Sequence, residues 1–221
     1  MEFRHFTKSY IIVLIIKNLS VQIIFISIIV GFISNFGSNA EIISYLTFLK
    51  FEIASYNNIG TYSFSETYYI YNEWWRLLTP MLLHFSFTHL AFNCLWIYIL
   101  GLRIEEIDGK IIFLTLAIFS SILSNIMQYF FSGSAFFGGL SGVVYGLIGF
   151  CMIREFEASK NIYEMPPALY LFMIIWLFLG FSGALDLFGF GSVANFAHLG
   201  GLISGIIFAM MYLIIPVKKY D

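Results

Sequence analysis

The sequence predicts an all-α polytopic membrane protein, a bundle of six transmembrane helices. Of its 221 residues, 60% are hydrophobic and only 11% are charged, and the mean hydropathy is +0.87. These values lie far outside the range of soluble domains. The apolar residues also gather in long runs separated by polar segments, as helices that cross a bilayer require. We therefore expect a single membrane domain over residues 1–221.

The predicted helices differ in length, and the fourth is too short to cross the membrane alone. It holds about 14 residues and so measures about 21 Å, against about 30 Å for the hydrocarbon core. The loop before it must then dip into the membrane, where irregular backbone needs protein cover or a water-filled cavity. The predicted segments are a cytoplasmic N-terminus (1–9), an interfacial loop (37–80) and helices at 10–36, 81–102, 111–131, 140–153, 168–185 and 197–216.

The first apolar segment has a signal peptide as its alternative, because Ser38-Asn39-Ala40 resembles a small-residue cleavage site. The segment is longer than the usual core of a signal peptide and is interrupted by Lys17. These two features favour a spanning helix.

Basic residues predict the orientation of the chain. They gather on one side of the predicted bundle, and the positive-inside rule makes that side cytoplasmic, together with both termini. The net charge of -2 offers no surface for nucleic acid. The basic residues of the cytoplasmic side are Arg4, Lys8, Arg103, Lys110, Arg154, Lys160, Lys218 and Lys219, and those of the other side are Lys50 and Arg76.

The loop at 37–80 is rich in tyrosine and tryptophan, whose rings with polar edges favour the headgroup layer. It can be an ordinary aromatic belt or a surface that contacts substrate, and both readings stay open. Trp74-Trp75-Arg76 at its end is expected to anchor the loop.

One serine stands among four glycines at the start of the fourth helix, in FGGLSGVVYG (137–146). A hydroxyl at such a turn lies close to backbone N–H groups. His198, near the outer end of the last helix, could match Ser141 in depth and act as its base. The alternative is that His198 only bridges helices and the glycines serve packing. Gly142 with Gly146, and Gly201 with Gly205, would let the two helices approach closely.

His89 and Asn93 are four residues apart and so share one face of the second helix. Both can donate hydrogen bonds to a developing oxyanion, together with the Ser141 amide. The alternative is a structural polar pair between helices. Tyr145, one turn after Ser141, either lines the same pocket or simply packs.

We expect the remaining polar residues to have structural roles. Asp186 is read as a loop residue, so a two-residue dyad is the simpler proposal. A charge network is expected from Arg103, Glu105, Glu106 and Asp108, and hydrogen bonds across helices from Ser121, Ser124, Asn125 and Gln128. Cys94 and Cys151 lie in apolar runs and are expected to pack as small hydrophobes.

Several of these residues occur together in an order that resembles the rhomboid intramembrane serine proteases, more narrowly those of the bacterial GlpG type. The ordered set is Trp75-Arg76, His84-Phe85-Ser86, His89 to Asn93, Glu105 with Gly109, Gly139-Leu140-Ser141-Gly142, and Ala197-His198 with Gly201 and Gly205. Any one of these motifs is weak, whereas the ordered set is specific.

The resemblance implies a function as well as a fold. It implies that Ser141 is the nucleophile and His198 the general base, without a carboxylate, and that His89, Asn93 and the Ser141 amide form the oxyanion hole. Tyr145 matches the tyrosine under the histidine, and Trp176 lies on a fifth helix that gates lateral entry. The implied substrates are transmembrane proteins in the bilayer of a bacterial inner membrane, with no cofactor or metal.

Three other functions compete with proteolysis. A non-catalytic rhomboid-like protein that binds membrane clients usually lacks the serine or the histidine, and both are present here. A small transporter would be expected to show an inverted repeat, and none is visible. A soluble-type hydrolase elbow would need a final glycine where Val143 stands.

Overall fold

The computed structural model describes residues 17–55, 58–184 and 193–214, most of which are helical. The structure places a helix in each of the six predicted ranges. The helices are α2 (Leu19–Ile33), α4 (Phe87–Trp96) with its continuation through the π-turn η4 (Ile97–Gly101) and α5 (Leu102–Ile107), α6 (Lys110–Ser132), α7 (Ser141–Ala158), α8 (Pro167–Phe181) and α10 (Asn195–Ile214).

Three of these helical segments are long and apolar enough to cross a membrane by length and composition: Phe87–Ile107, Lys110–Ser132 and Asn195–Ile214. Helices α2 and α8 are apolar but shorter within the described residues. The predicted N-terminus at 1–9, with Arg4 and Lys8, lies outside the described residues, as do Asp186, Lys218 and Lys219.

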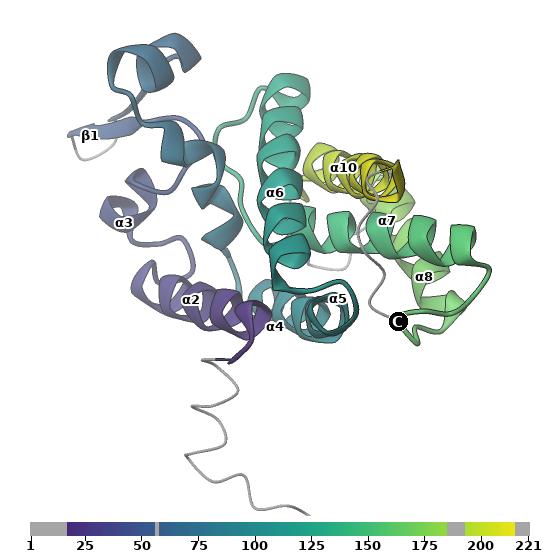
Figure 1. Ribbon diagram of the computed structural model, residues 1–221. Coiled ribbons are helices and arrows are strands. Elements are labelled where there is room, and N and C mark those ends of the chain that lie inside the picture. The colour runs from purple at the N-terminus through teal and green to yellow at the C-terminus, as the bar shows by residue number, and fades with distance from the viewer. Residues whose placement is uncertain (1–16, 56–57, 185–192, 215–221) are drawn as a thin grey trace, which may run out of the picture.

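Helix α6 stands at the centre of the bundle, with α2 on one side and the pair α7 and α10 on the other (Figure 1). The buried apolar residues of α7 form the middle of the core, and nearly all side chains from Gly142 to Cys151 are shielded by neighbouring helices. A helix that is apolar all round is expected to be surrounded in this way. Helix α7 is therefore the most fully buried helix among the described residues.

Glycines bring α7 and α10 into backbone contact, as the G-x-x-x-G spacing predicts. A methyl group at Gly201 would overlap the carbonyl oxygen of Gly142, and one at Gly205 would overlap that of Gly146. Small residues at these positions let two helix backbones approach more closely than larger side chains allow. The predicted close approach of these two helices is confirmed.

Several helix boundaries differ from the hydrophobic pattern, among them those of α2, which covers Leu19–Ile33 of the predicted 10–36, and two differences have a clear cause. The second helix begins at Phe87 instead of residue 81, because Ser86 caps its first turn by accepting a hydrogen bond from the His89 amide at 3.2 Å. Helix α7 continues past residue 153 to Ala158 through its charged end. Backbone hydrogen bonds set the length of a helix, so charged residues can extend it beyond its apolar part.

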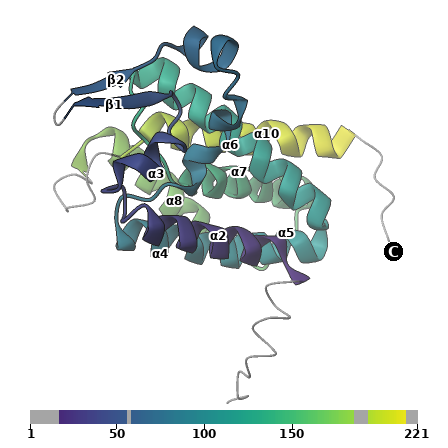
Figure 2. The same ribbon diagram turned by 90° about the vertical axis from the view of Figure 1, so that its left-hand side faces the viewer.

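The loop between α2 and α4 contains regular structure that the sequence analysis did not predict. It forms the short helix α3 (Ala40–Ser44), the antiparallel hairpin of β1 (Phe51–Ser55) and β2 (Asn58–Thr61), and the turns η1 (Glu66–Ile70), η2 (Trp74–Leu77) and η3 (Thr79–Leu82). Figure 2 shows the hairpin at one end of the bundle, far from the end of α10.

Charged side chains gather at the opposite end of α7 from Ser141. Asp108 accepts from Arg154 at 3.3 Å and from the Tyr163 hydroxyl at 2.7 Å. Glu105 accepts from the first amides of α2, Leu19 at 2.9 Å and Ser20 at 2.5 Å. The predicted network thus consists of separate contacts. In one of them, Glu105 acts as a cap for the first turn of α2.

Enlarging a contact glycine should destabilise the bundle. In a Gly205→Ala variant the new methyl meets the Gly146 carbonyl, so α7 and α10 must move apart, at a cost of about 1–3 kcal/mol. Unfolding in detergent micelles measures this loss. Gly60→Ala is the matched control, because a methyl there meets nothing within 4 Å. Equal stability of the two variants would contradict the close helix contact.

Candidate active site

The structure brings Ser141 and His198 together. Ser141 is the first residue of α7, and His198 lies in the first turn of α10. The His198 Nε2 atom lies 2.8 Å from the Ser141 hydroxyl oxygen, which is hydrogen-bond distance. The imidazole is buried, whereas the serine is only partly covered. A histidine nitrogen at this distance can remove a hydroxyl proton.

Tyr145 holds the imidazole from one face. Its ring stacks on that of His198 with centroids 4.8 Å apart and planes inclined by 28°. Its hydroxyl donates to the carbonyl oxygen of Met173 on α8 at 3.0 Å. The tyrosine is therefore both a support for the histidine and a tie between α7 and α8.

The turn before Ser141 is docked against η3 and the residue that follows it, Leu83. Gly139 has a φ of +122°, a conformation that side chains rarely adopt, and its amide donates to the Pro80 carbonyl at 3.0 Å. A methyl group at Gly138 would overlap Leu83 and the Pro80 carbonyl, and one at Gly139 would overlap the ring of His89. Gly138 and Gly139 are thus both required, because neighbouring residues leave no room for a side chain at either position.

His89 and Asn93 face this turn from α4. The His89 ring lies against Gly139, and the Asn93 amide group lies near the same glycine. Asn93 is buried, and within the described residues its Nδ2 is a donor without a hydrogen-bond partner. Buried donors are nearly always paired, so Asn93 Nδ2 is an unusual group, and it lies beside the turn that carries Ser141.

A small cavity lies behind the serine. Space for the centre of a water molecule amounts to about 10 Å³, which is room for about one water. The buried Ser124 hydroxyl on its wall has no hydrogen-bond partner among the described residues. The polar residues of the lining are Ser121, Ser124, Asn125 and Ser141.

Polar residues of α6 bond mainly to backbone groups of other elements. Ser121 donates to the Leu78 carbonyl at 3.3 Å, and Asn125 donates to the Leu77 carbonyl at 2.9 Å. Gln128 accepts from the Ala197 amide, next to His198, at 3.0 Å. The predicted hydrogen bonds across the bundle are present, except that Ser124 makes none that the described residues provide.

Comparison with known proteins identifies the family of this chain. A family model described as the Rhomboid domain matches residues 71–215, well over half of the chain. The chain belongs to the rhomboid family. It is 34% identical over 168 residues to the Rhomboid protease GlpG of Pectobacterium atrosepticum, and 40% identical over 139 residues to that of Serratia proteamaculans. These matches cover 76% and 63% of this rhomboid and 59% and 48% of the two relatives. Family and apolar helices together identify a membrane protein.

Trp176 of this rhomboid does not line the small cavity at Ser141. It projects from α8 and stacks on Phe92 of α4, with ring centroids 6.0 Å apart and planes inclined by 28°. Helix α8 is also tied to the start of α10, because the Asn195 side chain donates to the Gly180 carbonyl at 2.8 Å. Trp176 therefore lies at the seam between α8 and α4.

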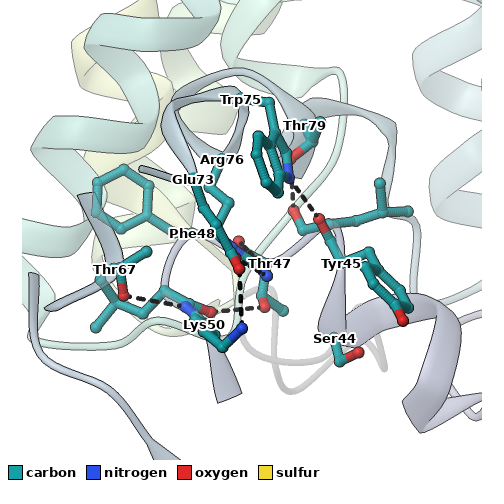
Figure 3. Close-up of polar contacts among 12 residues, drawn as sticks. Ser44, Tyr45, Thr47, Phe48, Lys50, Thr67, Glu73, Trp75, Arg76 and Thr79 are labelled. Atoms are coloured by element: carbon teal, nitrogen blue, oxygen red, sulfur yellow. Dashed lines mark hydrogen bonds and ion pairs between the residues drawn. The ribbon is translucent and has the colours of Figure 1, made fainter. Parts of the chain in front are cut away.

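The loop next to the site is braced by a buried charge cluster, which is shown in Figure 3. Glu73 accepts from Lys50 at 2.9 Å and from Arg76 at 2.5 Å, and Arg76 also donates to the Thr47 carbonyl at 3.0 Å. The Trp75 indole donates to the Tyr45 carbonyl at 3.2 Å. The predicted anchoring by the Trp-Arg motif is confirmed, and the brace holds η2, which directly precedes η3 with Pro80.

Acid should weaken this brace. Burial raises the pKa of Glu73, but hydrogen bonds and charge from Lys50 and Arg76 outweigh it, so the pKa lies below its ordinary value of 4.5. A carboxyl whose pKa is lower in the folded than in the unfolded protein stabilises the fold at pH values above its unfolded pKa. This stabilisation is lost as the pH falls through the folded pKa.

We therefore expect Glu73→Gln to unfold at a lower temperature than the wild type at pH 7, with a difference that stays constant down to about pH 5.5 and shrinks below about pH 4.5. Thermal unfolding in detergent measures this difference. Glu157→Gln, which removes an exposed carboxyl at the end of α7, is the control. A difference independent of pH would contradict the role of Glu73.

Proposed function

We propose that this rhomboid is an intramembrane serine endopeptidase that hydrolyses peptide bonds in or near transmembrane segments of membrane proteins. The observation that carries the proposal is the 2.8 Å contact between the Ser141 hydroxyl and His198 Nε2 in a membrane protein. The two relatives named Rhomboid protease support the same function.

In this mechanism Ser141 attacks the substrate carbonyl and His198 takes the hydroxyl proton. Nε2 must be unprotonated to accept that proton, so the neutral imidazole carries its hydrogen on Nδ1. The imidazolium then gives the proton to the leaving amine as the C–N bond breaks, and an acyl-enzyme remains. The stacked ring of Tyr145 keeps the imidazole in line through both transfers.

Water completes the reaction. The cavity behind Ser141 can hold about one molecule between polar side chains, and Ser124 offers it a buried hydroxyl. Such a water attacks the acyl carbon while His198 accepts its proton, and the Ser141 hydroxyl is restored as the acid product leaves. The proposed site is a water-filled cavity open to the outer side of the membrane.

The negative charge on the substrate oxygen is stabilised by the Ser141 amide and by the side chains of His89 and Asn93. The support for this assignment is the position of both side chains beside Gly139 and the unpaired Nδ2 of Asn93. Donors that are already in place before the reaction are the main source of such stabilisation.

The proposed setting is a bacterial inner membrane, crossed six times by one rhomboid domain over residues 1–221 with both termini in the cytoplasm. The substrate is a transmembrane segment that enters from the bilayer between α8 and α4. Trp176 and Phe92 close this seam, and their stacking supports a role in substrate access and lining for Trp176.

The alternative is a rhomboid-like protein that binds transmembrane clients without cutting them. It requires neither the contact between Ser141 and His198 nor an unpaired donor next to it. The proteolytic proposal accounts for both observations, and the variants described next separate the two functions.

Ser141→Ala and His198→Ala should each lower cleavage of a model transmembrane substrate by at least about 1,000-fold, because each removes one half of the proton-transfer pair. Cleavage by purified protein in liposomes, and covalent labelling by a fluorophosphonate probe, are the two measurements. Equal amounts of folded protein in the membrane serve as the control. Labelling that survives Ser141→Ala would overturn the proposal.

Asn93→Ala should lower kcat by about 10- to 1,000-fold, because it removes an oxyanion donor. Its thermal stability should not fall much, since Nδ2 has no partner to lose. Asn125→Ala is the comparison for stability: it leaves the Leu77 carbonyl unpaired and should unfold at a lower temperature. An Asn93 variant that is less stable but fully active would show a structural residue instead.

A further inference from the structure

His84 is a buried histidine to which the proposed reaction assigns no role. It lies in the non-helical stretch between η3 and α4, and its side chain is fully covered. Its two ring nitrogens contact backbone groups on both sides of the site. Nδ1 lies 3.1 Å from the Leu82 carbonyl oxygen, and the Leu140 amide donates to Nε2 at 3.3 Å.

These two contacts define the protonation state of the ring. A backbone amide can only donate, so Nε2 must be the acceptor. A carbonyl oxygen can only accept, so Nδ1 must carry the hydrogen. Both partners thus require the same neutral tautomer of His84, and a doubly protonated ring could not hold the Leu140 amide.

The position of Leu140 gives the contact its importance, because this residue immediately precedes Ser141. The Gly139 amide is held by the Pro80 carbonyl and the Leu140 amide by His84. The two amides before the serine are therefore both used to dock the turn, which leaves the Ser141 amide to face an oxyanion.

His84 also supports the other side of the oxyanion hole. Its ring packs edge to face against the ring of His89, with centroids 5.1 Å apart and planes inclined by 61°. One buried side chain thus contacts both the turn that carries Ser141 and a proposed oxyanion donor on α4.

We propose that His84 is a positioning residue for the protease reaction, which clamps the Leu140 amide and the His89 ring so that Ser141 and the oxyanion donors keep their relative places. It acts through its neighbours and has no free nitrogen with which to exchange a proton with substrate. The inference rests on the proposed function of Ser141.

Two substitutions of His84 distinguish a role as hydrogen-bond acceptor from a role in filling space. In His84→Gln the side-chain carbonyl can still accept from the Leu140 amide, whereas His84→Leu fills a similar space without an acceptor. We expect His84→Leu to lower kcat and the rate of fluorophosphonate labelling at Ser141 by about 10- to 100-fold, with little change in KM, since small displacements of reacting groups have effects of this size. His84→Gln should recover most of the loss.

Thr115→Val is the control, because it removes the hydrogen bond from an exposed hydroxyl of α6 to the Ile111 carbonyl, 2.8 Å long, which does not belong to the site. All rates are measured well below the unfolding temperature of each variant. His84→Leu should then be slow and Thr115→Val should not. A fast His84→Leu variant, or a His84→Gln variant as slow as His84→Leu, would overturn the proposal.

A readout that does not depend on activity separates this inference from the proposed function. Nitrogen-15 NMR of the imidazoles, with the His84 signals assigned by their absence in His84→Gln, should report a neutral ring protonated on Nδ1. Failure of the wild type to cleave or label would refute the protease function while leaving this signature in place. A ring protonated on Nε2 would refute the clamp even in an active enzyme.

Discussion

The backbone contact between α7 and α10 is the constraint on which the site depends. Ser141 directly precedes Gly142, and His198 lies one turn before Gly201, so the glycine that meets the Gly142 carbonyl also fixes the spacing of the two functional side chains. A wider helix separation would carry the imidazole away from the hydroxyl. The closeness that glycine permits is thus a requirement of the chemistry as well as of packing.

A second line of contacts reaches the serine from the loop between α2 and α4. The buried charges around Glu73 brace η2, the side chains of α6 hold the carbonyls of Leu77 and Leu78, and the Pro80 carbonyl receives the Gly139 amide. The loop is therefore part of the scaffold of the site. Its internal brace holds the segment that docks the turn before Ser141.

Much of the site could be predicted because it follows from local spacing. His89 and Asn93 share a helix face because they are four residues apart. The G-x-x-x-G pairs on α7 and α10 likewise predict a close contact between these two helices. The hydrophobic pattern misplaces the start of α4 at residue 81, although Ser86 gives a usable signal, since a serine before an apolar run is a favourable helix cap. The hairpin of β1 and β2 could not be predicted from spacing, because its strands are only five and four residues long. The stacking of Trp176 on Phe92 could not be predicted either, because it joins segments far apart in the chain. His84 belongs to the motif set that resembles the rhomboid proteases, but its contact with Leu140 could not be predicted from spacing, because it joins segments far apart in the chain.

The carboxylates at the far end of the bundle have a mechanical consequence. Glu105 pins the first turn of α2 to α5, and Asp108 links the end of that helix to Arg154 on α7 and to Tyr163. These contacts tie α2, α5 and α7 together at the end of the bundle away from Ser141. Because α7 is one continuous helix from Ser141 to Ala158, its anchored end also fixes the height of the serine within the bundle.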